Sequence, residues 1–330
     1  MGGLSRRVAL VNGIRQEKGT DLVVVDSGDL FFRDVQDAKD ERALKTAKLI
    51  TRIYKKMGVS AMNVGHLDLV QGVEFLANEQ LPVISANIRS STGKNLVFPP
   101  YQIREFSGIR IGFFGLIRPD IYMNLPQTVQ ETITIGDPVQ AARDVVGALR
   151  DRADVIILLS DLGFEQDKDL VSLVPGIHFI LAGHERNATV HPHREGGTYI
   201  MQSWVQGMYV GDLRLTLEKP GLPFQDGGTP ARLREQIHHL DRSIASLEET
   251  RKATPSPPPN IAAAILELSK QKKNLEMQEK GISPESYTKG NLFLWKLIPL
   301  EQSLPVDEEI QTWIKESGLE ADEEERIILY

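Results

Sequence analysis

Four polar residues, two carboxylates and two imidazoles, each follow a short apolar stretch of this chain. Asp29 follows "LVVVDSG", His66 follows "MNVG", Asp161 follows "VIILLS" and His184 follows "FILAG". In open α/β sheets, ligands bind beyond the carboxyl ends of the strands, where loops from several strands converge. A mixed set of carboxylate and imidazole groups suits Zn, Mn or Fe. The pattern therefore predicts a divalent metal site formed by these four residues.

Each of the four residues also has an ordinary structural interpretation. Asp29 and Asp161 could cap the segments that follow them, His66 could be a plain loop residue, and His184 could form a hydrogen bond within its own turn. A glycine precedes each histidine. Glycine permits a close backbone approach or a positive φ, which suits a binding site and equally suits any tight turn.

The elements that must position these residues are apolar runs that alternate with helical patterns up to about residue 218. Runs of Val, Ile and Leu without polar alternation indicate strands covered on both faces. The predicted class is a layered α/β fold, a β-sheet sandwich flanked by helices. The last two predicted strands are separated only by a Gly-rich turn, which predicts an antiparallel pair. Strands are predicted within 21–29, 81–88, 109–117, 154–163, 177–185, 198–204 and 210–218, and helices within 43–58 and 137–152.

The pattern changes after the first domain, residues 1–218. Residues 219–230 are rich in Gly and Pro and predict a linker. Residues 231–280 predict an antiparallel helical hairpin, because apolar residues recur at spacings of three and four on both sides of "TPSPPPN", which cannot continue a helix. The hairpin could be a spacer or the arm of a homodimer. Residues 281–330 predict a strand and a helix that return to the first domain.

Composition excludes several classes of function. The formal net charge of -7 disfavours a nucleic-acid partner, which requires clustered Lys and Arg. The chain has no cysteine, so disulfides and thiolate metal sites are excluded. Its apolar runs are shorter than the roughly 20 residues that cross a bilayer, so no membrane span is predicted.

Further motifs resemble a known family in their order and spacing. They are "GGLSRR", "VVVDSGDLFF", "NVG", "LPVISANI", "GIRIGFFGLI", "ADVIILLSDLG", "GIHFILAGHE" and "GTYIMQSWVQGMYVGDLRL". Together they resemble the catalytic domain of the bacterial 5'-nucleotidase family of calcineurin-like metallophosphoesterases, and "LIPLEQSLPVDEEI" resembles the segment after that domain. The resemblance implies a metal-dependent hydrolase of nucleotide catabolism, whose substrate is a phosphorylated small molecule such as a nucleotide.

The family's two-metal site is matched in part. Asp29 matches its bridging aspartate, and His184 matches the first histidine of its Gly-His motif. His66 stands where the family has an asparagine ligand, and Asp161 stands where it has a histidine ligand. All four can coordinate a cation, so the resemblance implies at most one well-formed metal site.

Other positions depart from the family's pattern. Leu67 stands where the family has the histidine that assists the leaving group, and Arg186 replaces the last histidine of the Gly-His motif. A guanidinium cannot coordinate a metal but can bind a phosphate through two N–H groups, so Arg186 is a predicted phosphate-binding residue; it could also be a surface arginine paired with Glu185. The family's Asp-x-His pair has no counterpart here. The resemblance implies that this pair, a first core strand and an export signal lie upstream of Met1, and that the protein is periplasmic or otherwise exported.

Two functions from different classes remain open. The first is a divergent metal-dependent phosphoester hydrolase. Its turnover would be reduced, because two-metal sites stabilise both the entering and the leaving oxygen and a positioned acid supplies about 10²- to 10⁴-fold. The second is a catalytically inactive protein of the same fold that binds a phosphorylated ligand or a protein partner. Asp167 and Asp169 are assigned no chemistry; they are predicted to be charges in the first turn of a helix.

Overall fold

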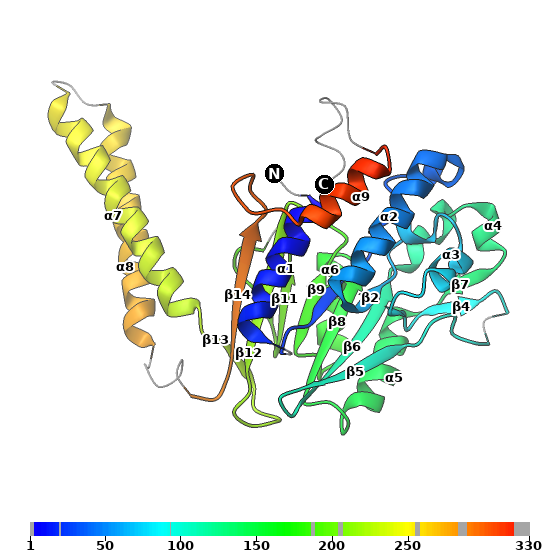
Figure 1. Ribbon diagram of the computed structural model, residues 1–330. Coiled ribbons are helices and arrows are strands. Elements are labelled where there is room, and N and C mark those ends of the chain that lie inside the picture. The colour runs from blue at the N-terminus through cyan, green and yellow to red at the C-terminus, as the bar shows by residue number, and fades with distance from the viewer. Residues whose placement is uncertain are drawn as a thin grey trace. The chain divides into compact units, whose positions relative to one another are not determined.

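The computed structural model divides the chain into two compact units. The first comprises Met1–Asp212 and Lys296–Tyr330, and the second comprises Leu213–Trp295. The arrangement of elements within each unit is shown in Figure 1. The structure describes residues 3–19, 21–92, 94–185, 189–203, 207–254, 258–282 and 289–319.

A six-stranded sheet is the largest sheet of the first unit. Its strand order is β10-β11-β9-β8-β6-β5. The four inner strands are parallel, whereas the edge strands β5 and β10 are antiparallel to their neighbours. The strands are β5 (Tyr101–Phe106), β6 (Ile109–Ile117), β8 (Val155–Asp161), β9 (Phe179–Ala182), β10 (His193–Glu195) and β11 (Thr198–Gln202).

A parallel three-stranded sheet packs against the larger one. It contains β1 (Val24–Asp26), β2 (Val59–Asn63) and β3 (Val83–Ile84), and β2 contacts β6 and β8. Gly115 of β6 allows the close approach, because a Cβ there would lie 2.2 Å from Asn63 Oδ1. A separate antiparallel pair joins β4 (Ile88–Ser90) to β7 (Ile133–Ile135). Two packed sheets with covering helices confirm the predicted fold class.

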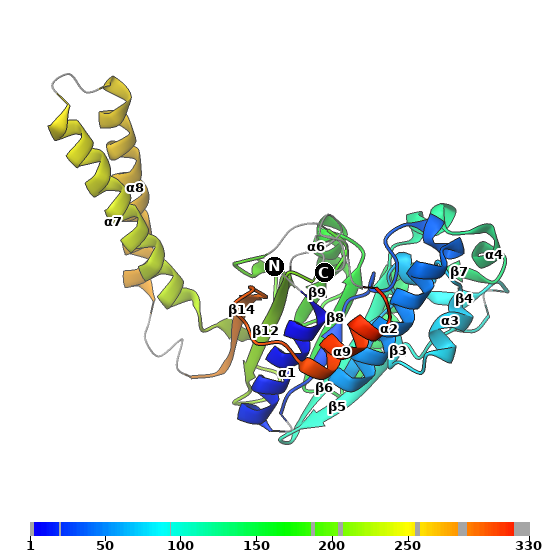
Figure 2. The same cartoon turned by 45° about the horizontal axis from the view of Figure 1, so that its top comes forward.

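Helices cover the outer faces of both sheets. Apolar residues of α5 and α6 share one buried cluster with β6 and β8, and α1, α2 and α9 contact one another over a second cluster beside β1 and β2 (Figure 2). None of the described helices has the length and apolar character that crossing a bilayer would require. The helices are α1 (Leu4–Lys18), α2 (Glu41–Met57), α3 (Val73–Asn78), α4 (Gln127–Gln130), α5 (Pro138–Leu149), α6 (Phe164–Leu173) and α9 (Glu308–Glu316), with 3-10 turns η1 (Val35–Lys39), η2 (Leu67–Leu69) and η3 (Pro119–Asn124).

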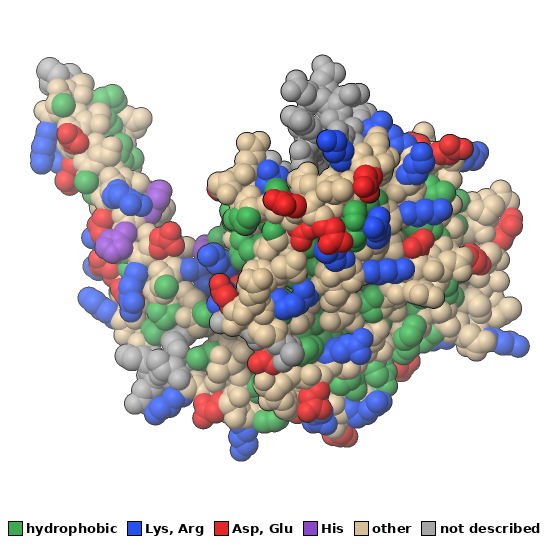
Figure 3. Space-filling view, viewed as in Figure 1, with side chains coloured by type: hydrophobic (Ala, Val, Ile, Leu, Met, Phe, Trp, Pro, Cys, Tyr) green, Lys and Arg blue, Asp and Glu red, His purple; other side chains and the backbone are tan. Residues whose placement is uncertain are grey.

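The second unit contains the helical hairpin. Helices α7 (Thr229–Ala253) and α8 (Pro259–Gly281) pack against each other. They run antiparallel, because Arg234 pairs with Glu279 at 2.8 Å and Lys272 pairs with Asp241 at 2.5 Å. The predicted hairpin is thereby confirmed. Charged side chains of both signs are spread over its surface in Figure 3.

One predicted strand pair is wrong. Strand β12 (Tyr209–Thr216) does not pair with β11; it belongs to a three-stranded sheet of order β12-β14-β13, with β13 (Phe224–Asp226) and β14 (Asn291–Pro299). The two strands differ in burial, because β11 is buried at every position whereas β12 is partly exposed. Residues 219–230, expected to be a linker, include β13 and the first residues of α7.

Candidate metal centre

The structure brings the four predicted ligand residues together at the carboxyl ends of strands from both sheets. Asp29 follows β1, His66 follows β2, Asp161 ends β8 and His184 follows β9. Each residue offers one ligand atom, and the four atoms all lie within 4.8 Å of one another. Convergence of this kind follows from parallel strands ending at a common edge.

The distances within this cluster suit ligands of one ion. His66 Nδ1 lies 3.0 Å from Asp29 Oδ2, and His184 Nδ1 lies 3.1 Å from Asp161 Oδ1. Ligand atoms that bind Zn at about 2.0–2.2 Å lie about 3 to 3.5 Å apart. Among the described residues, the buried Nδ1 of His66 has no well-aligned hydrogen-bond partner, so it faces Asp29 as a neighbouring ligand would.

Asp29, Asp161 and His184 do not form the local caps and turn contacts that are the ordinary alternatives to metal binding. Asp29 Oδ1 accepts a hydrogen bond from Leu67 N at 2.8 Å, on a different loop. The N-cap of α6 is Gly163, so Asp161 does not cap that helix. His184 bonds to Asp161 outside its own turn.

The backbone of the Asp29 loop is held in an uncommon conformation. Asp29 has φ 58 and Gly28 has φ 105. A non-glycine residue in the left-handed region is uncommon, although aspartate tolerates it better than most. A Cβ on Gly28 would lie 2.5 Å from Gly65 N. The two loops therefore meet backbone to backbone, which fixes the position of the Asp29 carboxylate.

Asp68 joins these two loops through hydrogen bonds to their backbone N–H groups. Its Oδ2 accepts hydrogen bonds from Asp29 N at 2.8 Å and Gly65 N at 2.9 Å. Its Oδ1 accepts from Leu30 N at 2.8 Å and Phe31 N at 3.1 Å. The side chain is fully buried. Asp68 therefore positions Asp29 and His66 without being one of the four converging groups.

The electrostatics of the cluster favour a cation. Burial and the charge of Asp29 raise the pKa of both Asp161 and Asp68. Burial opposes the charged form of His66, but the surrounding carboxylates, Asp29 foremost, together outweigh burial and raise the pKa of that imidazole. The hydrogen bond with Asp161 raises the pKa of His184. A divalent ion would relieve the repulsion among the carboxylates, so charge and donor types both fit a metal.

Arg118 is a neighbour of the cluster that the sequence analysis missed. It follows β6, and its Nη1 donates a hydrogen bond to His184 Nε2 at 3.0 Å. Arginine has no acceptor, so Nε2 accepts and the His184 proton lies on Nδ1, which donates to Asp161 Oδ1. A search of strand ends for every charged side chain would have found this residue.

Comparison with known proteins finds relatives that are named nucleotidases. No protein-family model matches the chain. It is 26% identical over 209 residues to the 2',3'-cyclic-nucleotide 2'-phosphodiesterase/3'-nucleotidase of Salmonella typhimurium, covering 55% of this chain and 32% of that protein. It is 25% identical over 249 residues to the 5'-nucleotidase of Vibrio cholerae, covering 63% of this chain and 44% of that protein. The chain thus spans less than half the length of these relatives.

A solved structure has a similar fold. The calcineurin-like phosphoesterase YfkN from Bacillus subtilis superposes with a TM-score of 0.63 at 17% identity, over 96% of this chain and 89% of that one. The chain is related to the 5'-nucleotidase family of calcineurin-like metallophosphoesterases. The resemblance inferred from the motifs is thereby confirmed.

Arg186 and Leu67 of this chain stand at positions where the family has histidines. Arg186, the predicted phosphate-binding residue, lies outside the described residues, so its role stays a prediction. Leu67 packs, partly buried, against an apolar cluster. It places no proton donor beside the four ligand residues.

Asp167 corrects a prediction from the sequence. It lies in the first turn of α6, but it is fully buried and accepts a hydrogen bond from Ser160 Oγ at 2.6 Å. Burial raises the pKa of this carboxyl to about 8. Asp169, on the same helix, is exposed.

The buried carboxyl of Asp167 predicts a pH dependence of stability. Between about pH 4 and pH 8 the unfolded chain loses this proton while the folded chain keeps it, so the free energy of unfolding falls as pH rises. We expect Asp167→Asn to make this decline shallower, which urea unfolding across that range measures; the raised pKa values of Asp68 and Asp161 add a decline of the same sign. Asp169→Asn is the matched control and should leave the decline in place. If the free energy of unfolding fell with pH equally in wild type and in Asp167→Asn, the raised pKa of Asp167 would be contradicted.

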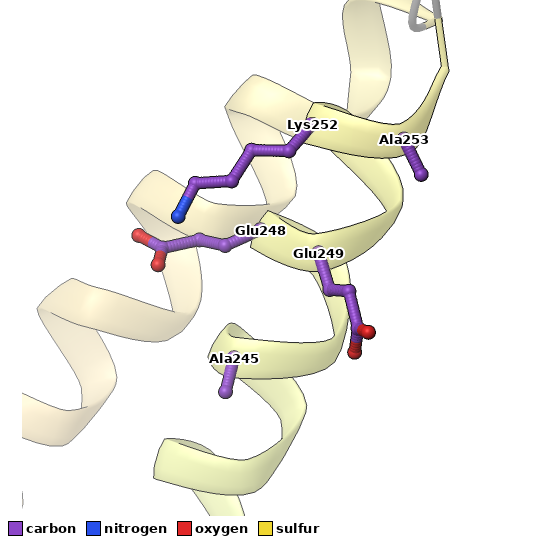
Figure 4. Close-up of a pocket in the computed structure, with 5 residues that line it drawn as sticks. All are labelled: Ala245, Glu248, Glu249, Lys252 and Ala253. Carbon is purple, nitrogen blue, oxygen red and sulfur yellow. The ribbon is translucent and has the colours of Figure 1, made fainter.

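A hollow on the hairpin carries no comparable chemistry. Ala245, Glu248, Glu249, Lys252 and Ala253 line it, and all five lie on the single helix α7 (Figure 4). Lys252 and Glu248 point toward the same side in that view. We assign this surface no function.

Proposed function

We propose that the chain is a metal-dependent phosphoester hydrolase of the 5'-nucleotidase type, with one ion of Zn, Mn or Fe held by Asp29, His66, Asp161 and His184. One observation carries the proposal: these four ligand atoms lie within 4.8 Å of one another at converging strand ends. The relatives named nucleotidases make a phosphorylated small molecule such as a nucleotide the expected substrate.

Residues of this chain position the candidate metal ligands. A divalent ion, when bound, polarises a phosphoryl oxygen. Asp68 fixes the loops that carry Asp29 and His66 through its four backbone hydrogen bonds. Asp161 orients the His184 ring through Nδ1. The Asp68 contacts hold the loops of Asp29 and His66 in place before a substrate arrives.

The apolar side chain of Leu67 shapes the expected substrate preference. Without a proton donor there, a leaving alkoxide must depart without acid assistance, which is worth about 10²- to 10⁴-fold. An aryl phosphate leaves as a weakly basic phenolate and needs less help. We therefore expect faster turnover of p-nitrophenyl phosphate than of a nucleoside monophosphate.

The test is a hydrolysis assay of the protein after chelation and reloading with Zn, Mn or Fe. We expect release of phosphate from p-nitrophenyl phosphate that depends on added metal and is abolished in Asp29→Ala. The control is Asp144→Ala, which removes an exposed carboxylate on α5 and should leave turnover unchanged. Turnover that survives in Asp29→Ala would contradict the proposal.

A noncatalytic role is the second candidate, and Leu67 is the observation that favours it. In that case the protein would take up metal and bind a phosphorylated ligand or a protein partner without turnover of either substrate. A homodimer formed through the hairpin stays a prediction, which sedimentation of the wild type and of a chain lacking residues 231–280 would test. An exported location likewise stays a prediction.

A further inference from the structure

Arg118 is placed at the same sheet edge as the four ligand residues. Ile117, the last residue of β6, pairs in parallel register with Asp161 of β8. Arg118 therefore begins the loop after β6, beside the end of β8 that carries Asp161. Its side chain is partly exposed, at 23%, so it borders both the cluster and solvent.

The guanidinium of Arg118 is anchored on one side. Its Nε donates to Asp120 Oδ1 at 2.5 Å, and its Nη2 donates to Asp120 Oδ2. Its Nη1 donates to His184 Nε2. A guanidinium has five N–H groups, and these three bonds use one from each nitrogen. One N–H on Nη1 and one on Nη2 are left over from them.

Coordination by His184 is incompatible with its present bond to Arg118. If His184 binds an ion through Nδ1, the ring proton moves to Nε2 and then faces a second donor on Arg118. If it binds through Nε2, Arg118 must leave that nitrogen. In either case Nη1 loses its acceptor while Asp120 still holds the other side of the guanidinium. An anionic oxygen beside the ion is the acceptor that fits both the charge and the geometry of the freed group.

We propose that Arg118 binds a phosphoryl oxygen of the ligand held at the cluster of Asp29, His66, Asp161 and His184. The inference rests on the proposed function, because it presupposes a phosphorylated ligand at that cluster. Arg118 then supplies positive charge beside His184. It acts on the ligand and not on the ion, so its loss should weaken anion binding and leave metal binding intact.

Calorimetric titration of inorganic phosphate into the metal-loaded protein, with metal content measured on the same samples, tests the inference. We expect Arg118→Gln to keep one ion per chain and to weaken phosphate binding about ten- to hundredfold, as loss of a charge-assisted hydrogen bond implies. Arg118→Lys keeps the charge without the planar guanidinium, so its phosphate affinity should lie between those of wild type and Arg118→Gln. Arg110→Gln is the matched control, because Arg110 forms a similar bidentate pair with Asp154 at the opposite end of β6.

The outcomes separate this inference from the proposed function. Phosphate affinity in Arg118→Gln equal to that of wild type would overturn the inference, and so would a metal-loaded wild type that binds no phosphate. If Arg118→Gln loses its metal, Arg118→Lys becomes the test variant. Phosphate affinity in Arg118→Lys equal to that of wild type would then count against the inference. Arg118-dependent phosphate binding without hydrolysis would support the inference and favour the noncatalytic role.

Discussion

Replacing Asp68 with alanine is expected to lower the free energy of unfolding by about 3 to 5 kcal/mol and to abolish metal binding. The carboxylate is fully buried and accepts four backbone hydrogen bonds from Asp29, Leu30, Phe31 and Gly65. Each buried donor left without an acceptor costs about 1–3 kcal/mol, and relaxation of the loops recovers part of the total. Once these loops move apart, Asp29 and His66 no longer face a common point.

Urea unfolding and metal content measure the two effects. Asp68→Asn is the informative companion, because it keeps the size of the side chain and one acceptor oxygen. We expect it to lose less stability than Asp68→Ala and to retain part of the metal affinity. A variant Asp68→Ala that unfolds within about 1 kcal/mol of wild type would show that these hydrogen bonds do not hold the site.

The second large effect is expected from Gly65→Ala. A Cβ at this position would lie 2.2 Å from Asp29 Oδ1 and 2.4 Å from Asp29 N. Neither atom can yield easily, because Asp68 holds the Asp29 amide and Leu67 N holds its Oδ1. The added methyl must therefore displace Asp29, and we expect metal affinity to fall at least about a hundredfold. Strain of this kind also lowers stability by about 1–3 kcal/mol.

Gly13→Ala is the control for the added methyl group. Gly13 lies within α1, and no atom would come within 4 Å of a Cβ there. An alanine in a helix interior is favoured over glycine by about 1 kcal/mol, so this variant should be as stable as wild type or slightly more stable, with unchanged metal affinity. Metal titration of the two variants side by side makes the comparison. Equal affinities in both would contradict the account of Gly65.

The main sheets could be predicted from the sequence because their strands are continuous apolar runs. Residues 109–117 and 154–163 match β6 and β8 closely, since both strands are covered on two faces. Helix α1 was not predicted, although Val8 and Val11 are buried on it. Its apolar residues do not gather on one face at helical spacing and Gly13 interrupts them, so the helix depends on contacts with α2 and α9 that no local pattern shows.

The convergence of the four candidate ligand residues could also be predicted, because residue type and position at a strand end suffice to propose it. The groups around them could not be found in this way. Asp167 looks like a surface carboxylate in the sequence, and only tertiary packing buries it against Ser160. Arg118 acquires its role from the parallel pairing of β6 with β8. Contacts between distant segments decide these cases, and single-sequence patterns do not contain them.

An anomalous difference map from crystals grown with Zn tests the existence of the metal centre most directly. The account predicts one strong peak about 2.0–2.2 Å from a ligand atom of each of Asp29, His66, Asp161 and His184. Crystals of Asp29→Ala should lack that peak. A cluster without a zinc peak in wild-type crystals, whether or not zinc is bound elsewhere on the chain, would contradict the account.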